Sequence, residues 1–155
     1  MIVEGTYALP GAPEVIWDLL MNPEVLAKSM PGTRRLDQTA PDRYEGTMRV
    51  GIGPITAAEF DLTISLRDVQ RPVSYAMEID GKGRFGFTRG LARVELAARD
   101  GGTEMRYRAD LQVGGKVAAV GQRLLESVSK LLTRQGLEAL QRELKTRLER
   151  GDAPA

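Results

Sequence analysis

The residue types that most often carry out chemistry in proteins are scarce in this chain. Its 155 residues include no cysteine and no histidine. Without cysteine there is no disulfide framework, no thiolate nucleophile and no cysteine-ligated zinc. Without histidine the commonest general base and the commonest ligand of transition metals are missing, which excludes Ser–His–Asp and Cys–His mechanisms. Any chemistry would depend on carboxylates, tyrosines or arginines.

Four carboxylates stand within apolar segments and are the first candidates for acid–base work: Glu59, Asp61, Glu78 and Asp80. Each alternates with apolar residues. In a strand, successive side chains point to opposite faces, so these carboxylates are expected to face water while their apolar neighbours face inward. A catalytic carboxylate pair or a metal site would have to point inward. We therefore predict no catalytic residue, no metal-binding residue and a protein that is not an enzyme.

A glycine-rich segment, Gly81 to Gly90, begins with a Gly-x-Gly-x-x-Gly pattern. No helical pattern follows it, so the dinucleotide-binding interpretation fails. We expect a flexible loop at the edge of a cavity. Its cations, Lys82, Arg84 and Arg89, either meet an anionic head group or partner surface, or belong to a simple solvated loop.

The apolar residues follow two periods, and these define the elements that position the candidates. Alternation with a period of two predicts strands near residues 2–9, 44–50, 60–66, 75–79, 92–96 and 105–113. Each segment is apolar on one face only, which indicates an antiparallel sheet with one side in water. Pro13 and Pro23 suit first helical positions and predict two short helices after the first strand.

After Gly114 and Gly115 the apolar residues recur at intervals of three and four, which predicts an amphipathic helix from about Val117 to Arg150. We predict an α+β fold in which a curved antiparallel sheet of about six to seven strands wraps around this long C-terminal helix. Residues 1–150 form a single domain, and residues 151–155 form a disordered tail. A helix is about 10 Å wide, so one helix cannot fill a broad curved sheet, and we expect a cavity between them.

The inward-facing residues of this helix and of the later strands form the predicted cavity wall. Gly121 and Gly136, inside the predicted helix, each cost about 1 kcal/mol relative to alanine. Their missing side chains either leave room for a ligand or a close strand, or mark a kink or a tight helix–sheet contact. For each wall residue the alternative is ordinary core packing. The predicted ligand-cavity residues are Tyr75, Met77, Phe85, Phe87, Tyr107, Leu111, Gly121, Leu124, Val128 and Leu132.

Several short motifs resemble those of one known family. Ala12 to Leu20 reads Ala-Pro-Glu-Val-Ile-Trp-Asp-Leu-Leu, followed by Asn22-Pro23-Glu24 and Met30-Pro31-Gly32. The run Val50 to Ile55 (Val-Gly-Ile-Gly-Pro-Ile) and the glycine pair before the last helix add to the pattern. Together they resemble the SRPBCC (START-like, helix-grip) superfamily and, within it, the family of the G subunit of carbon monoxide dehydrogenase. The resemblance covers about residues 1–140.

This resemblance implies a helix-grip fold with a hydrophobic cavity and no tightly bound cofactor. It implies a non-enzymatic accessory protein that binds a lipid- or quinone-like molecule and assists a molybdenum hydroxylase of the carbon monoxide dehydrogenase type, or links it to the membrane. Two alternatives stay open. One is a cyclase- or hydratase-type enzyme on the same fold, with Tyr75, Tyr107 or a buried arginine as its acid–base group. The other is an assembly chaperone with a closed core.

Charge and hydropathy bear on partners and location. Lys plus Arg number 22 and Asp plus Glu 21, a formal net charge of +1, which gives no electrostatic case for nucleic acid. The N-terminus does not read as a signal peptide, and no run approaches the roughly 18 apolar residues of a membrane span. We expect a cytoplasmic protein, with peripheral contact at the inner face of the cytoplasmic membrane. Its expected partners are an apolar small molecule and a molybdenum hydroxylase.

Overall fold

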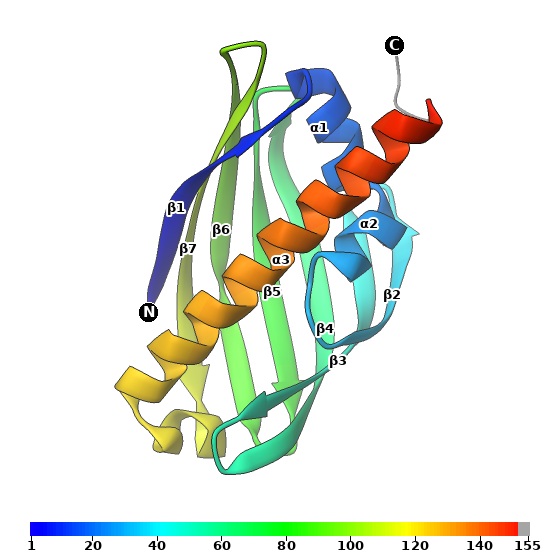
Figure 1. Ribbon diagram of the computed structural model, residues 1–155. Coiled ribbons are helices and arrows are strands. Elements are labelled where there is room, and N and C mark those ends of the chain that lie inside the picture. Colours follow the sequence, from blue (N-terminus) through cyan, green and yellow to red (C-terminus); the bar gives the residue numbers. More distant parts are fainter. Residues whose placement is uncertain (152–155) are drawn as a thin grey trace.

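The computed structural model describes residues 1–151 and has one sheet, two short helices and one long helix (Figure 1). The predicted α+β fold class is confirmed. Of the predicted tail, residues 152–155 lie outside the described part of the chain. In chain order the elements are β1 (Ile2–Leu9), α1 (Pro13–Met21), α2 (Pro23–Lys28), β2 (Thr33–Ala40), β3 (Arg43–Ile52), β4 (Ile55–Gln70), β5 (Ser74–Gly83), β6 (Gly86–Arg99), β7 (Gly102–Gly114), the 3-10 helix η1 (Gly115–Val120) and α3 (Gln122–Arg150).

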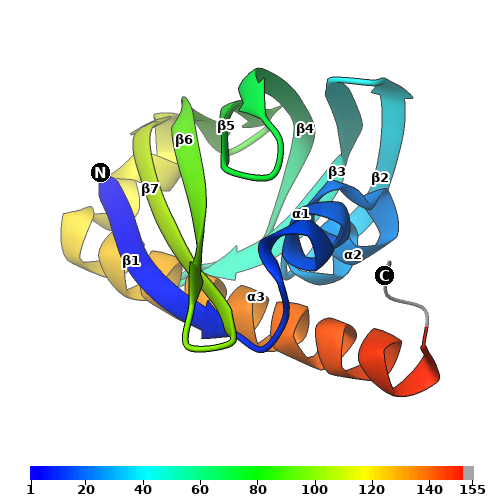
Figure 2. The same cartoon turned by 90° about the horizontal axis from the view of Figure 1, so that it is seen from above.

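The seven strands hydrogen-bond in the order β1-β7-β6-β5-β4-β3-β2, and each neighbouring pair is antiparallel. The chain therefore meanders from β2 to β7, while β1 pairs with the last strand. Figures 1 and 2 show the sheet curving around α3, which crosses its concave side. In this register Tyr107 of β7 lies opposite Gly5 of β1 on one side and Val94 of β6 on the other. Val94 in turn lies opposite Tyr75 of β5.

The two short helices begin where their prolines predict. Pro13 and Pro23 occupy the first turns of α1 and α2, where a missing backbone N–H costs nothing. Asn22 separates the helices, and its side-chain oxygen accepts hydrogen bonds from the backbone N–H groups of Glu24 (2.9 Å) and Val25 (3.4 Å). This is a side-chain N-cap, which satisfies donors that the first turn leaves free. The helices therefore pack at a fixed place against one end of the sheet.

The long helix begins later than predicted. Residues 115–120, the segment that includes Val117, form the 3-10 helix η1, and α3 starts only at Gln122. Gly121 lies between them with φ +101° and ψ 151°, a conformation that L side chains rarely adopt and that no helix contains. Its backbone therefore separates the two helical segments, and the prediction that it lies inside the helix is wrong.

The sheet contains more of the chain than the sequence patterns predicted. Residues 33–40, left unassigned by the alternation, form the edge strand β2. The segment from Gly81 to Gly90 is not a loop but the ends of β5 and β6, joined through Arg84 and Phe85. A side chain at Gly83 would place its Cβ within van der Waals overlap of the Glu59 carbonyl oxygen. These glycines therefore permit close backbone approach between strands.

The interior contains separate apolar clusters. The largest lies where α1 and the C-terminal half of α3 meet β5–β7, and Trp17 and Tyr75 make an edge-to-face contact there, with ring centroids 5.2 Å apart. A second cluster, around Ile52, Phe60 and Val117, closes the opposite end, beside η1 and the start of α3. A third lies between α2 and β2–β5. The C-terminal half of α3 therefore contributes buried residues to the largest cluster, whereas its N-terminal half contributes only partly buried residues to the second.

Candidate functional site

The N-terminal half of α3 covers the sheet without being buried in it. None of the residues 122–135 is fully buried, whereas Gly136, Leu140 and Leu144 of the C-terminal half are. Apolar residues on the inner face of the strands beneath it, such as Met77 and Leu111, are likewise only half-buried. Protein cores are close-packed and leave few voids. Half-buried apolar side chains on both facing surfaces therefore mark a space under this part of the helix that is less tightly packed than the C-terminal half.

A groove of about 430 Å³ opens between β1 and α3 at the side of this space. Its lining residues are Met1, Ile2, Val3, Glu4, Tyr107, Glu126, Ser129, Lys130, Thr133 and Arg134. Tyr107 comes from β7, behind the edge strand, and it reaches the groove because Gly5 on β1 carries no side chain. An added Cβ at Gly5 would lie 2.6 Å from the Tyr107 Oη. The groove thus contains a residue of the sheet's inner face.

The polar groups of the groove differ in whether they are already paired. Glu4 forms an ion pair with Arg108 at 3.2 Å, and the Glu126 carboxylate accepts a hydrogen bond from the Gln122 side chain at 3.0 Å. Within residues 1–151 no partner is found for the Tyr107 hydroxyl. Burial raises the pKa of Tyr107, so its phenol stays neutral and able to donate a hydrogen bond.

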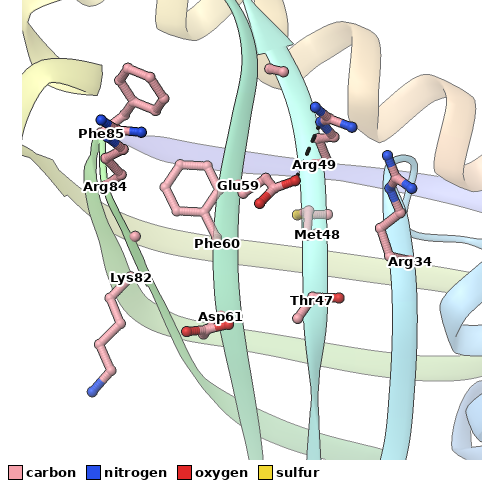
Figure 3. Close-up of a pocket in the computed structure, with 12 residues that line it drawn as sticks. Arg34, Thr47, Met48, Arg49, Glu59, Phe60, Asp61, Lys82, Arg84 and Phe85 are labelled. Atoms are coloured by element: carbon pink, nitrogen blue, oxygen red, sulfur yellow. Dashed lines mark ion pairs between the residues drawn. The ribbon is translucent and has the colours of Figure 1, made fainter.

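A second concavity, of about 650 Å³, is highly charged and lies away from α3 (Figure 3). It forms where β4 continues past the end of β5. Its lining residues are Arg34, Thr47, Met48, Arg49, Ala57, Glu59, Phe60, Asp61, Lys82, Gly83, Arg84 and Phe85. Arg49 and Glu59 form an ion pair there at 3.5 Å, drawn as a dashed line in Figure 3. Its many charged groups make it unlike an apolar ligand site.

The carboxylates predicted to face water do so. Glu59, Asp61, Glu78 and Asp80 are all exposed. The fully buried polar side chains among residues 1–151 are Ser74 and Thr103. A buried carboxylate paired with a tyrosine, the arrangement that would favour a cyclase or hydratase, is therefore not found in the described part of the chain. Nor does this part contain a cluster of acidic side chains suited to holding a metal ion.

The predicted cavity residues separate into several environments. Tyr107 lines the groove, and Met77, Leu111 and Leu132 are half-buried. Tyr75 belongs to the dense cluster around Trp17, and Phe85 and Val128 pack against the cluster at the opposite end. Leu124 contacts the β3–β4 turn, where a Cβ on Gly53 would overlap its side chain. The ten residues predicted from the sequence therefore do not line one common cavity.

Phe87 does not belong to this set. In β6 the side chains on the inner face are those of even-numbered residues, such as Ala92, Val94 and Leu96. Phe87 is odd-numbered, so its side chain points to the outer face. Its ring lies over Gly114, and the Arg89 guanidinium carbon is 4.8 Å from the ring centroid. The sequence interpretation treated this segment as a loop. It therefore did not use the alternation of faces along a strand, which would have shown that Phe87 points outward.

The two glycines of the predicted helix also differ from each other. Gly121 is exposed, and a Cβ there would meet nothing within 4 Å, so it makes no room for a strand or for an enclosed ligand. Its conformation is what requires glycine. Gly136 is buried, and a Cβ would lie 2.4 Å from the Ser29 carbonyl oxygen. Gly136 therefore marks a tight contact, made with the end of α2 rather than with the sheet.

Sequence reasoning missed the polar side of the groove. Ser129, Lys130, Thr133 and Arg134 lie on the hydrophilic side of an amphipathic helix, which normally faces bulk water. Only the register that places Gly5 opposite Tyr107 lets a residue of the sheet's inner face reach these side chains. The alternation of apolar residues in β1 and β7 could have indicated this arrangement, but only if the pairing of the two strands had been known.

Comparisons with known proteins agree with this architecture. A sequence model of the family described as the G subunit of carbon monoxide dehydrogenase (CoxG) matches residues 5–145. A crystal structure of a conserved protein from Geobacillus kaustophilus has 31% sequence identity and a TM-score of 0.88, with 95% of this chain and 97% of that chain covered. No curated protein matches the chain.

More distant structures show the same fold. A START superfamily protein from Mycobacterium smegmatis superposes with a TM-score of 0.70 at 12% identity, covering 94% of this chain and 97% of that one. The Zhui aromatase/cyclase from Streptomyces sp. R1128 superposes with a TM-score of 0.71 at 14% identity, covering 96% and 95%. No helix within residues 1–151 has the length and apolar character needed to cross a membrane. The START-like, helix-grip fold predicted from the sequence is therefore confirmed, and the chain belongs to the CoxG family, that of the G subunit of carbon monoxide dehydrogenase.

Proposed function

We propose that this protein is a non-enzymatic accessory protein that binds an apolar, lipid- or quinone-like molecule between the N-terminal half of α3 and the inner face of β5–β7. The observation that carries the proposal is the loosely packed apolar surface under residues 122–135, near Leu111, together with the groove of about 430 Å³ that opens beside it. Ligand sites are typically concave and mostly apolar, with few polar groups. The space under α3 is apolar in this way, and the adjoining groove supplies the polar groups.

Hydrophobic burial would supply most of the affinity. Removing roughly 300 Å² of apolar ligand surface from water contributes about 7 kcal/mol at about 25 cal/mol per Å². Part of this gain is offset by the ligand's lost freedom of motion and by ordering of the helix. Since 7 kcal/mol corresponds to a Kd of about 10 μM, a molecule with a chain of about ten carbons is expected to bind in the range of roughly tens to hundreds of micromolar. Such an affinity suits a molecule that is carried and released rather than held as a cofactor.

Family membership supports a proposal about the partner. A protein of the CoxG family is expected to act beside a molybdenum hydroxylase of the carbon monoxide dehydrogenase type, in the cytoplasm and at the inner face of the membrane. Affinity purification of the tagged protein from its native host tests this by molybdenum content and by mass spectrometry of the captured proteins. Capture without a molybdenum enzyme would contradict the partner while leaving the ligand proposal in place.

The ligand proposal is tested by looking for the molecule and by measuring its effect on stability. Native mass spectrometry and organic extraction of the purified protein should reveal a bound apolar compound. A ligand at one hundred times its Kd stabilises a protein by about 2.7 kcal/mol, which for a domain of this size raises Tm by roughly 5–10 °C. The absence of both a bound compound and a thermal shift with decylubiquinone or dodecanoate would refute it.

A matched pair of variants locates the site. Leu111→Trp places extra volume on the inner face beneath α3 and should lower affinity for decylubiquinone at least tenfold. Leu91→Trp adds the same side chain on the outer face, where Leu91 is 50% exposed, and should leave affinity unchanged. Equal effects of the two variants, or none, would place binding elsewhere.

A further inference from the structure

We propose that the groove between β1 and α3 holds the polar head of the bound molecule, and that Tyr107 is the residue that recognises it. The ligand is then an amphiphile whose head carries oxygen acceptors, a carbonyl or a carboxylate, and whose apolar part lies beneath α3. This inference rests on the proposed function and adds to it a direction of binding, a recognition residue and a class of head group.

The position of the Tyr107 hydroxyl is set by the pairing of β1 with β7. Gly5 lies directly opposite Tyr107, and because Gly5 has no side chain the Tyr107 Oη lies over its backbone and reaches the groove. With any larger residue at position 5, a Cβ 2.6 Å from this oxygen would force the ring to move. Gly5 is thus a positioning residue, and the strand pair delivers a polar group of the inner face to the molecular surface.

The unused hydrogen-bonding capacity of the groove favours an acceptor on the ligand. Within the described residues, Tyr107, Lys130, Thr133 and Arg134 have no side-chain partner. The ammonium and guanidinium groups can only donate. Both groove carboxylates are already engaged, Glu4 by Arg108 and Glu126 by Gln122, and the Ser129 hydroxyl contacts the Met1 sulfur at 3.5 Å. The two charged side chains of the groove that have no partner, Lys130 and Arg134, can only donate, so a head group rich in acceptor oxygens complements the site.

The surroundings of Tyr107 give the ligand its direction. On the groove side are the polar residues of α3, and on the opposite side the inner-face row continues through Val94 to Tyr75, in the apolar cluster. Along β7 the next inner-face positions are Ala109 and Leu111, both half-buried under the helix. A molecule with its head at Tyr107 can therefore place its apolar part beneath α3 without burying a charge, which would be costly.

The experiment removes one hydroxyl and compares probes that differ in their heads. Dissociation constants of decylubiquinone, dodecanoate and dodecane are measured by displacement of a fluorescent apolar probe. Tyr107→Phe should weaken binding of a headed probe roughly three- to twelvefold, the range for one net hydrogen bond, and leave dodecane unchanged. Tyr7→Phe is the matched control, since the Tyr7 hydroxyl donates to Gln141 outside the groove. Circular dichroism confirms that each variant is folded.

Two further variants separate the sources of the acceptor and the role of Gly5. If the head is a carboxylate, Lys130→Ala with Arg134→Ala weakens dodecanoate selectively; if it is a neutral carbonyl, only Tyr107→Phe acts, and it acts on decylubiquinone. Gly5→Ala should reduce the ratio of headed to headless affinity in the wild-type background but not in Tyr107→Phe. Either source supports the inference.

Three outcomes would overturn it. Headed probes could bind Tyr107→Phe as tightly as the wild type, or dodecane could weaken as much as they do. In both cases an apolar site remains and the proposed function stands. If none of the three probes binds the wild-type protein, the proposed function and the inference fail together.

Discussion

Four tyrosines occur in the chain, and the structure gives their hydroxyl groups different fates. The Tyr7 hydroxyl donates to the Gln141 side chain, and the Tyr44 hydroxyl to the Met21 carbonyl oxygen at 2.9 Å. No partner is found for Tyr75 or Tyr107 among residues 1–151. Tyr75 is only 3% exposed. Its hydroxyl oxygen is nevertheless not fully enclosed: among the described residues, the enclosed side-chain oxygen without a partner is Thr33 Oγ1.

Tyr75→Phe removes no hydrogen bond between described residues and should therefore leave the free energy of unfolding nearly unchanged. Tyr44→Phe, which leaves the Met21 carbonyl oxygen without its donor, should lower the free energy of unfolding by about 1 kcal/mol. Urea denaturation at neutral pH measures both. A loss of 1 kcal/mol or more for Tyr75→Phe would mean that its hydroxyl is satisfied in solution, for example by an ordered water molecule.

Tyr75, with Tyr44 near it, also predicts that the free energy of unfolding depends on pH. Burial, and secondarily the nearby Tyr44, raise the pKa of Tyr75 above its ordinary value of 10.0. The folded state therefore binds this proton more tightly than the unfolded state, so the contribution is complete below about pH 10 and is lost as the pH rises above it. Stability should fall more steeply between pH 10 and 11.5 in the wild type than in Tyr75→Phe. Parallel slopes in urea titrations would contradict the assignment.

At the residue scale, the sequence correctly predicts which side chains point inward and which point to water, wherever a strand is recognised from its pattern. Glu59 and Asp61 alternate with buried Phe60 and Leu62, and the carboxylates face water as expected. Phe87 was wrongly assigned to the cavity wall because its segment was interpreted as a loop, where side chains do not alternate between two faces. Whether Tyr107 reaches solvent depends on a glycine about one hundred positions away in the chain, and a single strand's pattern does not contain such a pairing.

Among the elements, α3 combines two different kinds of packing. Its C-terminal half is held by Leu140 and Leu144 and by the contact at Gly136, while the N-terminal half lies over half-buried side chains. The hydrophobic spacing of three and four runs evenly through both halves, so the sequence predicted the helix but not this difference. Which half is buried depends on what packs beneath it, and that is settled by the position of α1 and α2.

Gly136→Ala tests the tight contact. In a free helix this change would stabilise by about 1 kcal/mol. Here the new Cβ would lie 2.4 Å from the Ser29 carbonyl oxygen, so overpacking should instead destabilise the protein by about 1–3 kcal/mol. Ser127→Ala, at an exposed position of the same helix, is the control and should be neutral or slightly stabilising. Thermal unfolding of both variants gives the comparison, and stabilisation by Gly136→Ala would disprove the contact.

For the molecule as a whole, the open sheet poses a problem of unpaired edges. β1 and β2 are the terminal strands of the order, and an edge strand can recruit another chain. β1 lies beside α3 in Figure 1. β2 has register shifts next to Thr33 and Ala40 and carries the Arg35–Asp37 ion pair. Irregular pairing and charge both disfavour edge-to-edge association.

Removing the charged residues from the β2 edge should allow copies of the protein to associate through this strand. The double variant Arg35→Val with Asp37→Val is expected to associate in a concentration-dependent manner, measured by light scattering between 10 and 200 μM (about a twentyfold range). Arg67→Val with Glu78→Val removes a similar ion pair, at 2.8 Å, from strands inside the sheet and should not associate. Scattering that is equal in both variants would indicate a general effect of surface apolarity rather than of the edge.

The difference in packing between the two halves of α3 affects how fast each half can open. Opening of the N-terminal half, next to the backbone break at Gly121, would separate few buried groups, whereas global unfolding must also break the dense cluster around Trp17. Local opening therefore requires only a fraction of the free energy of unfolding. The residence time of a bound molecule and the heat resistance of the protein are thus set by different parts of one helix, and a change in either can leave the other untouched.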